Sequence, residues 1–305
     1  MPRPSIGRAF NRRRFLASAA AASAAGALAV STAPRAAAQN AVLGTVLDYS
    51  AGVPSARSVK AAGHLGAVRY VSQRRPGADW MHGKPVSLAE AQDFKASGLA
   101  TASVYQFGKD ATADWLAGAA GAATHAPQAI ALHKAAGGPT GRPIYVAVDD
   151  NPSRAQYEGQ IRPYLRAFGA ALAATGYQTG VYGNYNVIQW CVDDGIGSFF
   201  WMHDWGSGGK VHPRAQLHQV SKRQARIDGI ECDINEVLAA DWGQWTPGQA
   251  PAQTGTQQPG TPQPGTQQPG TSPITIPGTQ IQVTPEMVEQ AGQLSSQASS
   301  RLPGR

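Results

Sequence analysis

Short apolar runs alternate with helix-like stretches over residues 42–241, and this alternation constrains the fold more than any other feature of the chain. Eight runs are typical of buried strands: Val42–Tyr49, Ala67–Val71, Leu99–Gln106, Pro143–Val148, Gln178–Tyr182, Ser198–Trp201, Ala215–Val220 and Ile227–Asp233. Strands that alternate with helices form parallel α/β sheets, and a set of eight favours a closed barrel over an open sheet. We therefore expect an α/β fold, a (β/α)8 TIM-like barrel.

The stretches between the runs carry helix signals. Ser87 and Glu90 have capping-box spacing, and Pro163 predicts that the helix around it is kinked or begins late. About 200 residues are few for a barrel of this type, so we expect a small variant with some helices short or missing. The helices are expected over Ser55–Ala62, Leu88–Ser97, Thr112–Ala136, Ser153–Thr175, Asn184–Cys191 and Ile234–Ala240.

The positive charge of the chain is concentrated at its N-terminus. The 305 residues include 26 Lys and Arg against 19 Asp and Glu, a formal net charge of +7. Residues 1–38 hold six of the basic residues and no acid, so 20 basic and 19 acidic residues remain after them. A nucleic-acid-binding surface needs clustered Lys and Arg on the folded domain. We therefore expect no nucleic-acid partner.

Residues 1–38 are typical of an export signal. The segment Asn11-Arg-Arg-Arg-Phe-Leu16 resembles the twin-arginine signature, an Ala-rich run follows, and Ala36 and Ala38 fit an A-x-A cleavage site. The run is too short and too rich in Ala for a membrane span, which needs about 20 strongly apolar residues. We predict a signal peptide for the twin-arginine export machinery and a secreted or envelope-associated protein. An uncleaved anchor and a disordered basic arm are the alternatives.

The composition changes after Trp245. Residues 246–273 repeat a G-T-x-Q-P motif without apolar periodicity, which predicts an extended, disordered linker. Thr284 and Pro285 are typical of a short helix start. We therefore divide the chain into a signal peptide (1–38), a barrel domain (39–245), a disordered linker rich in Pro, Gln, Gly and Thr (246–284) and a tail that holds the short helix (285–305).

Polar and aromatic residues stand where the apolar runs end. The C-terminal ends of parallel strands meet at one mouth of a barrel, and the site is built there. Rings that stack on sugars and planar polar groups that bond hydroxyls are typical of a carbohydrate site, and paired carboxylates suit glycosidic cleavage. Simple capping of loops by the Asp residues is the alternative. The end residues are Asp48, Tyr70, Gln106, Asp149, Tyr182, Trp201, Gln219 and Asp233.

Short motifs resemble a known family through their order along the chain. Over about residues 42–241 the sequence resembles an actinobacterial, twin-arginine-exported glycoside-hydrolase-like domain family, which is similar to the family 25 lysozymes. The resemblance implies a small barrel that acts on or binds a cell-envelope glycan such as peptidoglycan. The motifs are Thr45-Val-Leu-Asp48, Arg69-Tyr70-Val, Val104-Tyr-Gln106, Ile144-Tyr-Val-Ala-Val-Asp149, Gly180-Val-Tyr182-Gly and Gln219 followed by Asp228-Gly-Ile-Glu-Cys-Asp233.

One position departs from the lysozyme pattern. Family 25 lysozymes carry Asp-x-Glu after the fourth strand, with the Glu as proton donor, whereas this chain has Asp149-Asp150-Asn151. Three replacements are open as donor: Asp150, Asp233 and Glu231. By strand alternation Glu231 shares the face of Asp233 but lies deeper in the barrel, where burial would raise its pKa.

The candidate roles follow from these positions. If the barrel is hydrolytic, Asp149 is the nucleophile or electrostatic stabiliser, and Asp48 and Asp233 position substrate or water. If hydrolysis has been lost, the chain is a non-catalytic glycan-binding or structural envelope protein whose tail reaches through the wall. The candidate catalytic residues are Asp149, Asp48, Asp233, Glu231 and Asp150, and the candidate substrate-binding residues are Tyr70, Gln106, Tyr182, Trp201 and Gln219.

No motif indicates a metal or a cofactor, because the seven His and two Cys lack H-E-x-x-H and C-x-x-C spacing. We expect neither group, and a monomer. Cys191 and Cys232 should lie three strands apart around the barrel, farther than the roughly 7 Å that a disulfide spans between Cα atoms. We predict two free thiols. The basic cluster Lys222–Arg226 is predicted to form a solvated turn.

Overall fold

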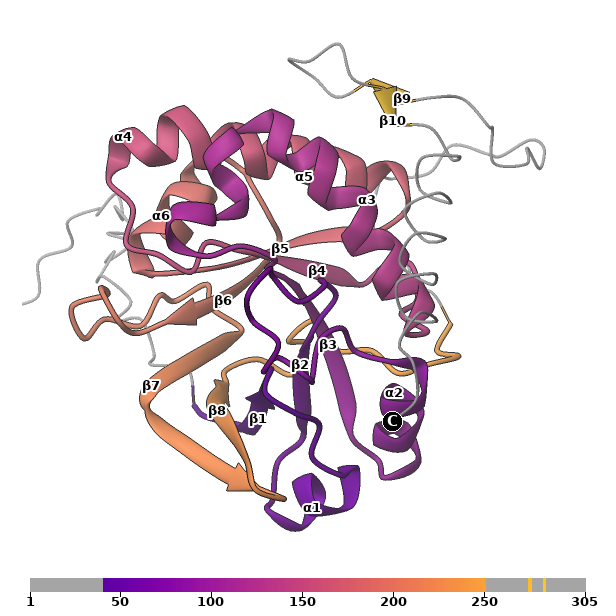
Figure 1. The fold of residues 1–305 in the computed structure, drawn as a ribbon. Coiled ribbons are helices and arrows are strands. Elements are labelled where there is room, and N and C mark those ends of the chain that lie inside the picture. Colours follow the sequence, from indigo (N-terminus) through magenta and orange to yellow (C-terminus); the bar gives the residue numbers. More distant parts are fainter. Residues whose placement is uncertain (1–40, 251–273, 276–281, 284–305) are drawn as a thin grey trace, which may run out of the picture. The chain divides into compact units, whose positions relative to one another are not determined.

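A closed eight-stranded barrel forms the core of the computed structural model, which describes residues 41–250 and two short strands at 274–275 and 282–283 (Figure 1). Neighbouring strands follow chain order around the barrel, and β8 closes it against β1. This confirms the predicted α/β barrel. The strands are β1 Gly44–Asp48, β2 Gly66–Tyr70, β3 Ala100–Tyr105, β4 Pro143–Ala147, β5 Gln178–Gly183, β6 Phe199–His203, β7 Leu217–Ile227 and β8 Ile230–Val237.

Helices follow the first five strands. Two 3-10 turns (η1 and η2) precede α3, and a π-helical turn (η3) joins α4 to α5. α3 and α5 pack against each other, and α5 packs on β5 (Figure 1). The elements are α1 Ala56–Ala61, α2 Leu88–Ala96, η1 Asp110–Thr112, η2 Asp114–Ala117, α3 Ala119–Ala135, α4 Arg154–Gln156, η3 Tyr157–Ile161, α5 Arg162–Ala174 and α6 Tyr185–Asp193.

Local sequence explains the helix starts. Ser55, Ser87, Ser153 and Asn184 each accept a backbone N–H with the side chain at a helix N-terminus. The π-helical turn over 157–161 immediately precedes the helix that holds Pro163, as the prediction of a late or kinked helix required, because proline removes a backbone donor.

The eighth strand runs against both of its neighbours. β1–β7 pair in parallel, whereas β8 is antiparallel to β7 and to β1. Only Asp228 and Gly229 separate β7 from β8, and both have positive φ, 52° and 80°. A two-residue Asp-Gly turn of this kind joins antiparallel strands only. The expectation of eight parallel strands is therefore wrong at β8.

The same hairpin overturns two local predictions. Residues 222–226, expected as a turn, belong to β7, and residues 234–237, expected to begin a helix, belong to β8. The turn signal was present in the sequence as Asp228-Gly229 between alternating residues, a pattern that favours a hairpin. β6 and β7 also connect without a helix, which agrees with the expected shortage of helices.

Three clusters of apolar side chains stabilise the described barrel. Val46, Val104, Trp201 and Leu217 belong to a cluster formed by strands around the barrel, and a larger cluster joins the strands to α3, α5 and α6. The two free cysteines are buried in different clusters, Cys191 on α6 and Cys232 on β8 beside α1, in agreement with the predicted free thiols.

Residues 1–40 and most of the chain beyond 250 lie outside the described residues, together with the predicted signal peptide and the predicted helix start at Thr284. β9 (Ile274–Thr275) and β10 (Gln282–Val283) pair antiparallel within the segment predicted as linker. Among the described helices, none has the length and apolar character to cross a membrane.

Trp245 completes the fold at the end of the domain. Its backbone bonds Thr101 at the edge of β3 in both directions, its indole Nε1 donates to the Ser103 hydroxyl at 3.0 Å, and its side chain is fully buried. The segment after β8 is therefore part of the barrel domain.

Replacing Trp245 by Ala should lower the free energy of unfolding by about 3–5 kcal/mol, because a large buried side chain is removed and Ser103 loses a partner. Trp80→Ala is the matched control: its ring is 52% exposed, so its effect should stay within about 0.5 kcal/mol. Equilibrium urea unfolding measures both, and equal losses would contradict the assigned packing.

Candidate functional site

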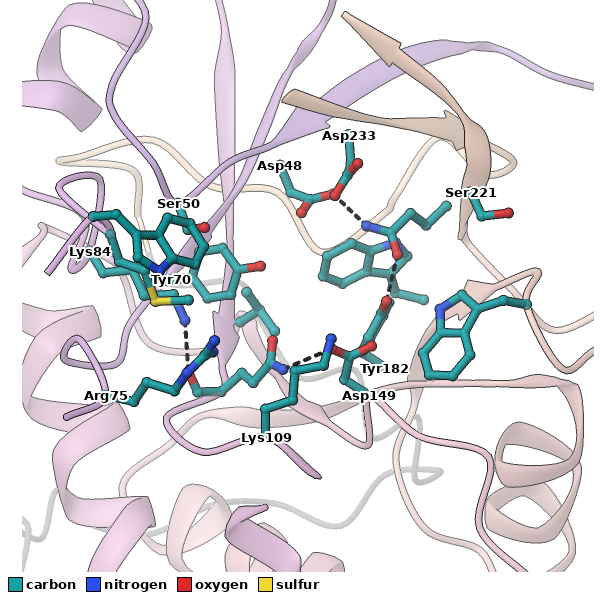
Figure 2. A pocket seen from close by; sticks show the side chains of 17 residues that line it. Asp48, Ser50, Tyr70, Arg75, Lys84, Lys109, Asp149, Tyr182, Ser221 and Asp233 are labelled. Atoms are coloured by element: carbon teal, nitrogen blue, oxygen red, sulfur yellow. Dashed lines mark hydrogen bonds and ion pairs between the residues drawn. The ribbon is translucent and has the colours of Figure 1, made fainter. Parts of the chain in front are cut away.

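A cavity of about 410 Å³ opens at the end of the barrel where β1 and β2 finish, a size typical of ligand sites (Figure 2). All eight strand-end residues predicted from the sequence line it together. Nine further residues complete its lining. The lining residues are Asp48, Ser50, Tyr70, Arg75, Trp80, Met81, Lys84, Val104, Gln106, Lys109, Asp149, Tyr182, Trp201, Trp205, Gln219, Ser221 and Asp233.

Asp48 and Asp233 face each other across the β1–β8 ladder, where they are register partners. Asp48 is the last residue of β1, but Asp233 is the fourth residue of β8 and not its end. The predicted place of Asp233 at a strand end is therefore wrong. It reaches the mouth all the same, because β8 enters the barrel from this side.

Two oriented amides hold Asp48. Gln219 Nε2 and Asn235 Nδ2 both donate to Asp48 Oδ2, at 2.9 and 2.8 Å. The Tyr182 hydroxyl donates to Gln219 Oε1, and Trp201 Nε1 donates to Asn235 Oδ1 at 2.7 Å. These aromatic donors fix which end of each amide faces the carboxyl group, so Asp48 sits in a fully specified hydrogen-bond network.

Burial raises the pKa of Asp48 to about 7, and the nearby charge of Asp233 adds to the rise. Asp149 acts in the same direction, whereas the amide donors from Asn235 and Gln219 oppose it. The side chain is only 3% exposed. Burial and a neighbouring carboxyl group both disfavour the charged form, so Asp48 holds its proton to a higher pH than an ordinary aspartic acid does.

Asp149 occupies a different environment. It follows β4, and its Oδ2 accepts from Gln106 Nε2 at 3.0 Å and faces Lys109 Nζ at 3.2 Å. Figure 2 shows Lys109 and Asp149 side by side, across the cavity from Asp48 and Asp233. The cavity thus combines Asp48, whose pKa is raised, with a separate acidic side chain, Asp149, beside a cation. Acid-assisted cleavage uses two acidic groups in different environments of this kind.

Aromatic rings line the cavity on several sides. The Tyr182 and Trp201 rings pack with centroids 4.2 Å apart, and Tyr70 ends β2. Trp205 stacks on His203 with centroids 4.0 Å apart, and half-exposed Trp80 stands on the β2–α2 loop. The hydroxyl of Tyr182 and the indole N–H of Trp201 are already bonded to the amides, so these residues offer a ligand mainly their ring surfaces.

Two of the candidate proton donors lie away from the main cavity. Glu231 is exposed on the β7–β8 hairpin and lines an adjoining pocket of about 190 Å³. The prediction that it lies deeper in the barrel is wrong, because β8 is reversed and residues before Asp233 lie farther out. Asp150 is absent from the cavity lining, and its Oδ1 accepts the backbone N–H of Asn151.

Asn151, which stands at the position of the lysozyme proton donor, also turns away from the cavity. Its Oδ1 accepts from Asn184 Nδ2 at 2.9 Å, at the start of α6. Gly206, with φ of 74°, packs so closely on the Asn151 amide that a Cβ there would collide with it. Asn151 therefore links the loop after β4 to the start of α6 and to the loop that holds Gly206.

Sequence reasoning missed Asn235 and three cations of the cavity, Arg75, Lys84 and Lys109. Asn235 was detectable, because it stands two residues after Asp233 and shares its face once β8 is read as a continuing strand. The three cations lie on loops, where no periodic pattern marks them. Within the part of the chain that the structure describes, no cluster of three His, Cys, Asp or Glu side chains is suited to hold a metal ion.

The barrel and the polar, aromatic cavity at its end define a glycoside hydrolase-like domain. Residues 57–237 match the model of the Rv2525c-like, glycoside hydrolase-like domain family, and the chain belongs to this family.

Relatives of known sequence and structure agree with this assignment. The chain is 52% identical over 205 residues, 67% of its length, to Rv2525c of Mycobacterium tuberculosis, covering 84% of that protein, which is described as a candidate peptidoglycan hydrolase. It is similar to the crystal structure of the Tat-secreted protein Rv2525c in complex with L-tartrate, with a TM-score of 0.64 over 67% of this chain and 100% of that one. A second crystal form, with HEPES, gives 0.63 over 67% and 99%.

The expected export by the twin-arginine route is confirmed, because the relative Rv2525c is Tat-secreted. The protein is exported and is secreted or associated with the envelope.

The raised pKa of Asp48 predicts a pH-dependent cost of folding. Folding favours the protonated form of Asp48. The stability that protonated Asp48 contributes is therefore complete below about pH 4 and is lost as pH rises toward 7. Asp48→Asn should therefore gain stability relative to the native protein between pH 4 and 7 and keep that gain above 7. Asp79→Asn, at an exposed site, is the control. A constant difference across pH 4–8 in thermal unfolding would contradict the shift.

Proposed function

We propose that this protein binds and hydrolyses a glycan of the cell envelope, such as peptidoglycan, in the cavity at the barrel mouth. The observation that carries the proposal is the convergence of Asp48 on β1, Asp233 on β8 and Asp149 just after β4 on one cavity lined by aromatic rings. The family assignment and the description of the Mycobacterium tuberculosis relative support the same substrate class.

In the proposed reaction the Asp48–Asp233 pair gives a proton to the leaving oxygen as the glycosidic bond breaks. A water molecule adds its hydroxyl to the sugar carbon and returns a proton to the pair. Asp48 Oδ2 accepts hydrogen bonds from the amides of Gln219 and Asn235. Oδ1 of Asp48 is therefore the oxygen that carries the proton. Asp149, beside Lys109, serves as nucleophile or electrostatic stabiliser on the other side of the bond. Of the three candidate replacements for the missing Glu, only Asp233 lines the main cavity, and there it is the partner of Asp48.

The finer assignments of the chain are part of this proposal. The barrel is a reduced (β/α)8 barrel with its last strand reversed. Residues 1–38 are a signal peptide for the twin-arginine machinery, and the exported domain acts as a monomer. Tyr70, Gln106, Tyr182, Trp201 and Gln219 form the sugar-binding wall of the cavity.

A non-catalytic glycan binder is the second candidate, and the position of Asn151 favours it. The residue that replaces the lysozyme acid is bonded to Asn184 and lies outside the cavity lining. The replacement of this acid by Asn151 leaves the cavity lining intact. The cavity can therefore bind a glycan even if Asp48 and Asp233 transfer no proton.

Incubation with purified peptidoglycan sacculi separates the two candidates. Hydrolysis predicts that the native protein releases new reducing ends, and that Asp149→Asn lowers the rate by about 100-fold or more while sedimenting with the sacculi as before. Asp150→Asn, at a residue outside the cavity lining, is the matched control and should release reducing ends at the native rate.

Sedimentation with sacculi and no reducing ends from the native protein would establish the binder instead. An absence of both would reject the whole assignment. Folding of each variant is checked by its thermal unfolding midpoint.

A further inference from the structure

The cavity is divided by charge. Figure 2 shows Arg75, Lys84 and Lys109 along one side, with Asp149 beside Lys109, and Asp48 and Asp233 on the other. A neutral sugar chain needs no such division, because its hydroxyls bond to amides and carboxylates equally well. The cationic side is therefore the part of the site that bond cleavage alone does not explain.

Lys84 is the most unusual of these cations. Its side chain belongs to a residue only 4% exposed, its Nζ donates to the Gln106 carbonyl at 3.0 Å, and it lies 3.8 Å from the centroid of the Tyr70 ring. Within the described residues no acidic side chain pairs with it. The charges of Asp114 and Asp149 act favourably on Lys84, but neither side chain forms an ion pair with it. A buried ammonium without an ion pair is costly, and an ammonium has three N–H donors, of which one is used here. Burial, with Arg75 adding to it, lowers the pKa of Lys84 to about 7.

The fold holds this lysine in place. Arg69, fully buried on β2, donates to the Gly83 carbonyl at 2.6 Å and to the Glu90 carboxylate on α2. The Gly83 N–H donates to the Ser50 carbonyl at 2.8 Å. A Cβ at position 83 would meet the Gly52 carbonyl at 2.5 Å, so only glycine allows this approach. The residue before Lys84 is thus fixed from two sides.

Arg75 supplies a second charge without an acidic partner. It lines the same cavity and is half-buried, and the ion pairs found in residues 41–250 do not include it. Lys109, by contrast, is paired with Asp149. Lys84 and Arg75 together therefore present two basic side chains without ion-pair partners to the same cavity.

We propose that Lys84 and Arg75 bind a carboxylate carried by the glycan, so that the substrate is an acidic glycan and not a neutral one. This inference rests on the proposed function and narrows its substrate class. A carboxylate accepts the remaining Lys84 donors and offsets the charge of Arg75. Its single negative charge fits a cavity that also holds three aspartates, whereas a doubly charged phosphate would be repelled by them. The uncharged glycosidic linkage then lies toward Asp48 and Asp233.

The carboxylate has two chemical sources, a uronic acid in the sugar chain or a peptide attached to it. Binding by isothermal titration calorimetry distinguishes them with four probes. These are neutral tetra-N-acetylchitotetraose, a hyaluronan tetrasaccharide with glucuronic acid, a disaccharide-peptide muropeptide with free carboxylates, and the same muropeptide with its carboxylates amidated. Asp149→Asn protein is used throughout so that no probe is cleaved.

A carboxylated probe is expected to bind at least about tenfold more tightly than its uncharged counterpart, as a charge-assisted hydrogen bond implies. In the same background Lys84→Met and Arg75→Gln should each abolish most of this preference while leaving the neutral probes unchanged. Lys134→Met, at an exposed lysine of α3, is the matched control and should keep the preference. Arg75, being half-buried, gives a readout even if Lys84→Met fails to fold.

Each outcome decides the proposal. Preference for the hyaluronan probe identifies a uronic acid, and preference for the free over the amidated muropeptide identifies a peptide carboxylate. Equal binding of neutral and carboxylated probes would overturn the proposal but leave the glycan cavity standing. Failure of every probe to bind would overturn the proposed function and this inference together.

Discussion

The antiparallel pairing of β8 with β1 is the constraint on which the site depends. It closes the barrel, and its register sets Asp48 directly opposite Asp233. It also brings Asn235 under Asp48, where its amide donates to the carboxyl group and is itself oriented by Trp201. A parallel β8 would place residues 231–235 in the opposite order along the barrel axis, and this acid pair would not form at the mouth.

The barrel supports the acid pair through a short chain of contacts. Aromatic side chains that a sequence reading assigns to sugar stacking also position amides, as Tyr182 does for Gln219. The low exposure of Asp48 and the nearness of Asp233 together retain a proton at a site that has no glutamic acid at position 151. Charge on the opposite side, from Lys84 and Arg75, gives the same cavity a means to select its ligand.

Most strand ends of this fold could be predicted from the sequence, whereas the direction of β8 and the position of Glu231 were predicted wrongly. Buried parallel strands are continuous apolar runs, so the strand ends at Asp48, Tyr70 and Gln106 could be read from the sequence and do meet in one cavity. The reversal of β8 was missed because a strand's direction leaves no mark on its own residues; only the Asp228-Gly229 turn indicated it. Glu231 was misplaced by the same error.

The three cations of the cavity could not be predicted from the sequence for a different reason. Lys84 is buried by a loop whose path is set by Arg69, Gly83 and Glu90, contacts between residues far apart in the chain. No local pattern separates such a lysine from a solvated one. The position of a charged residue that is buried by tertiary contacts can be recognised only from the three-dimensional structure.

The most direct test of the account is a crystal structure of the Asp149→Asn protein with a bound carboxylated oligosaccharide. We predict that a glycosidic oxygen of the oligosaccharide lies within hydrogen-bond distance of Asp48 or Asp233, with the carboxylate of the oligosaccharide beside Lys84. An oligosaccharide bound outside this cavity, or one whose glycosidic oxygens contact neither aspartate, would contradict it.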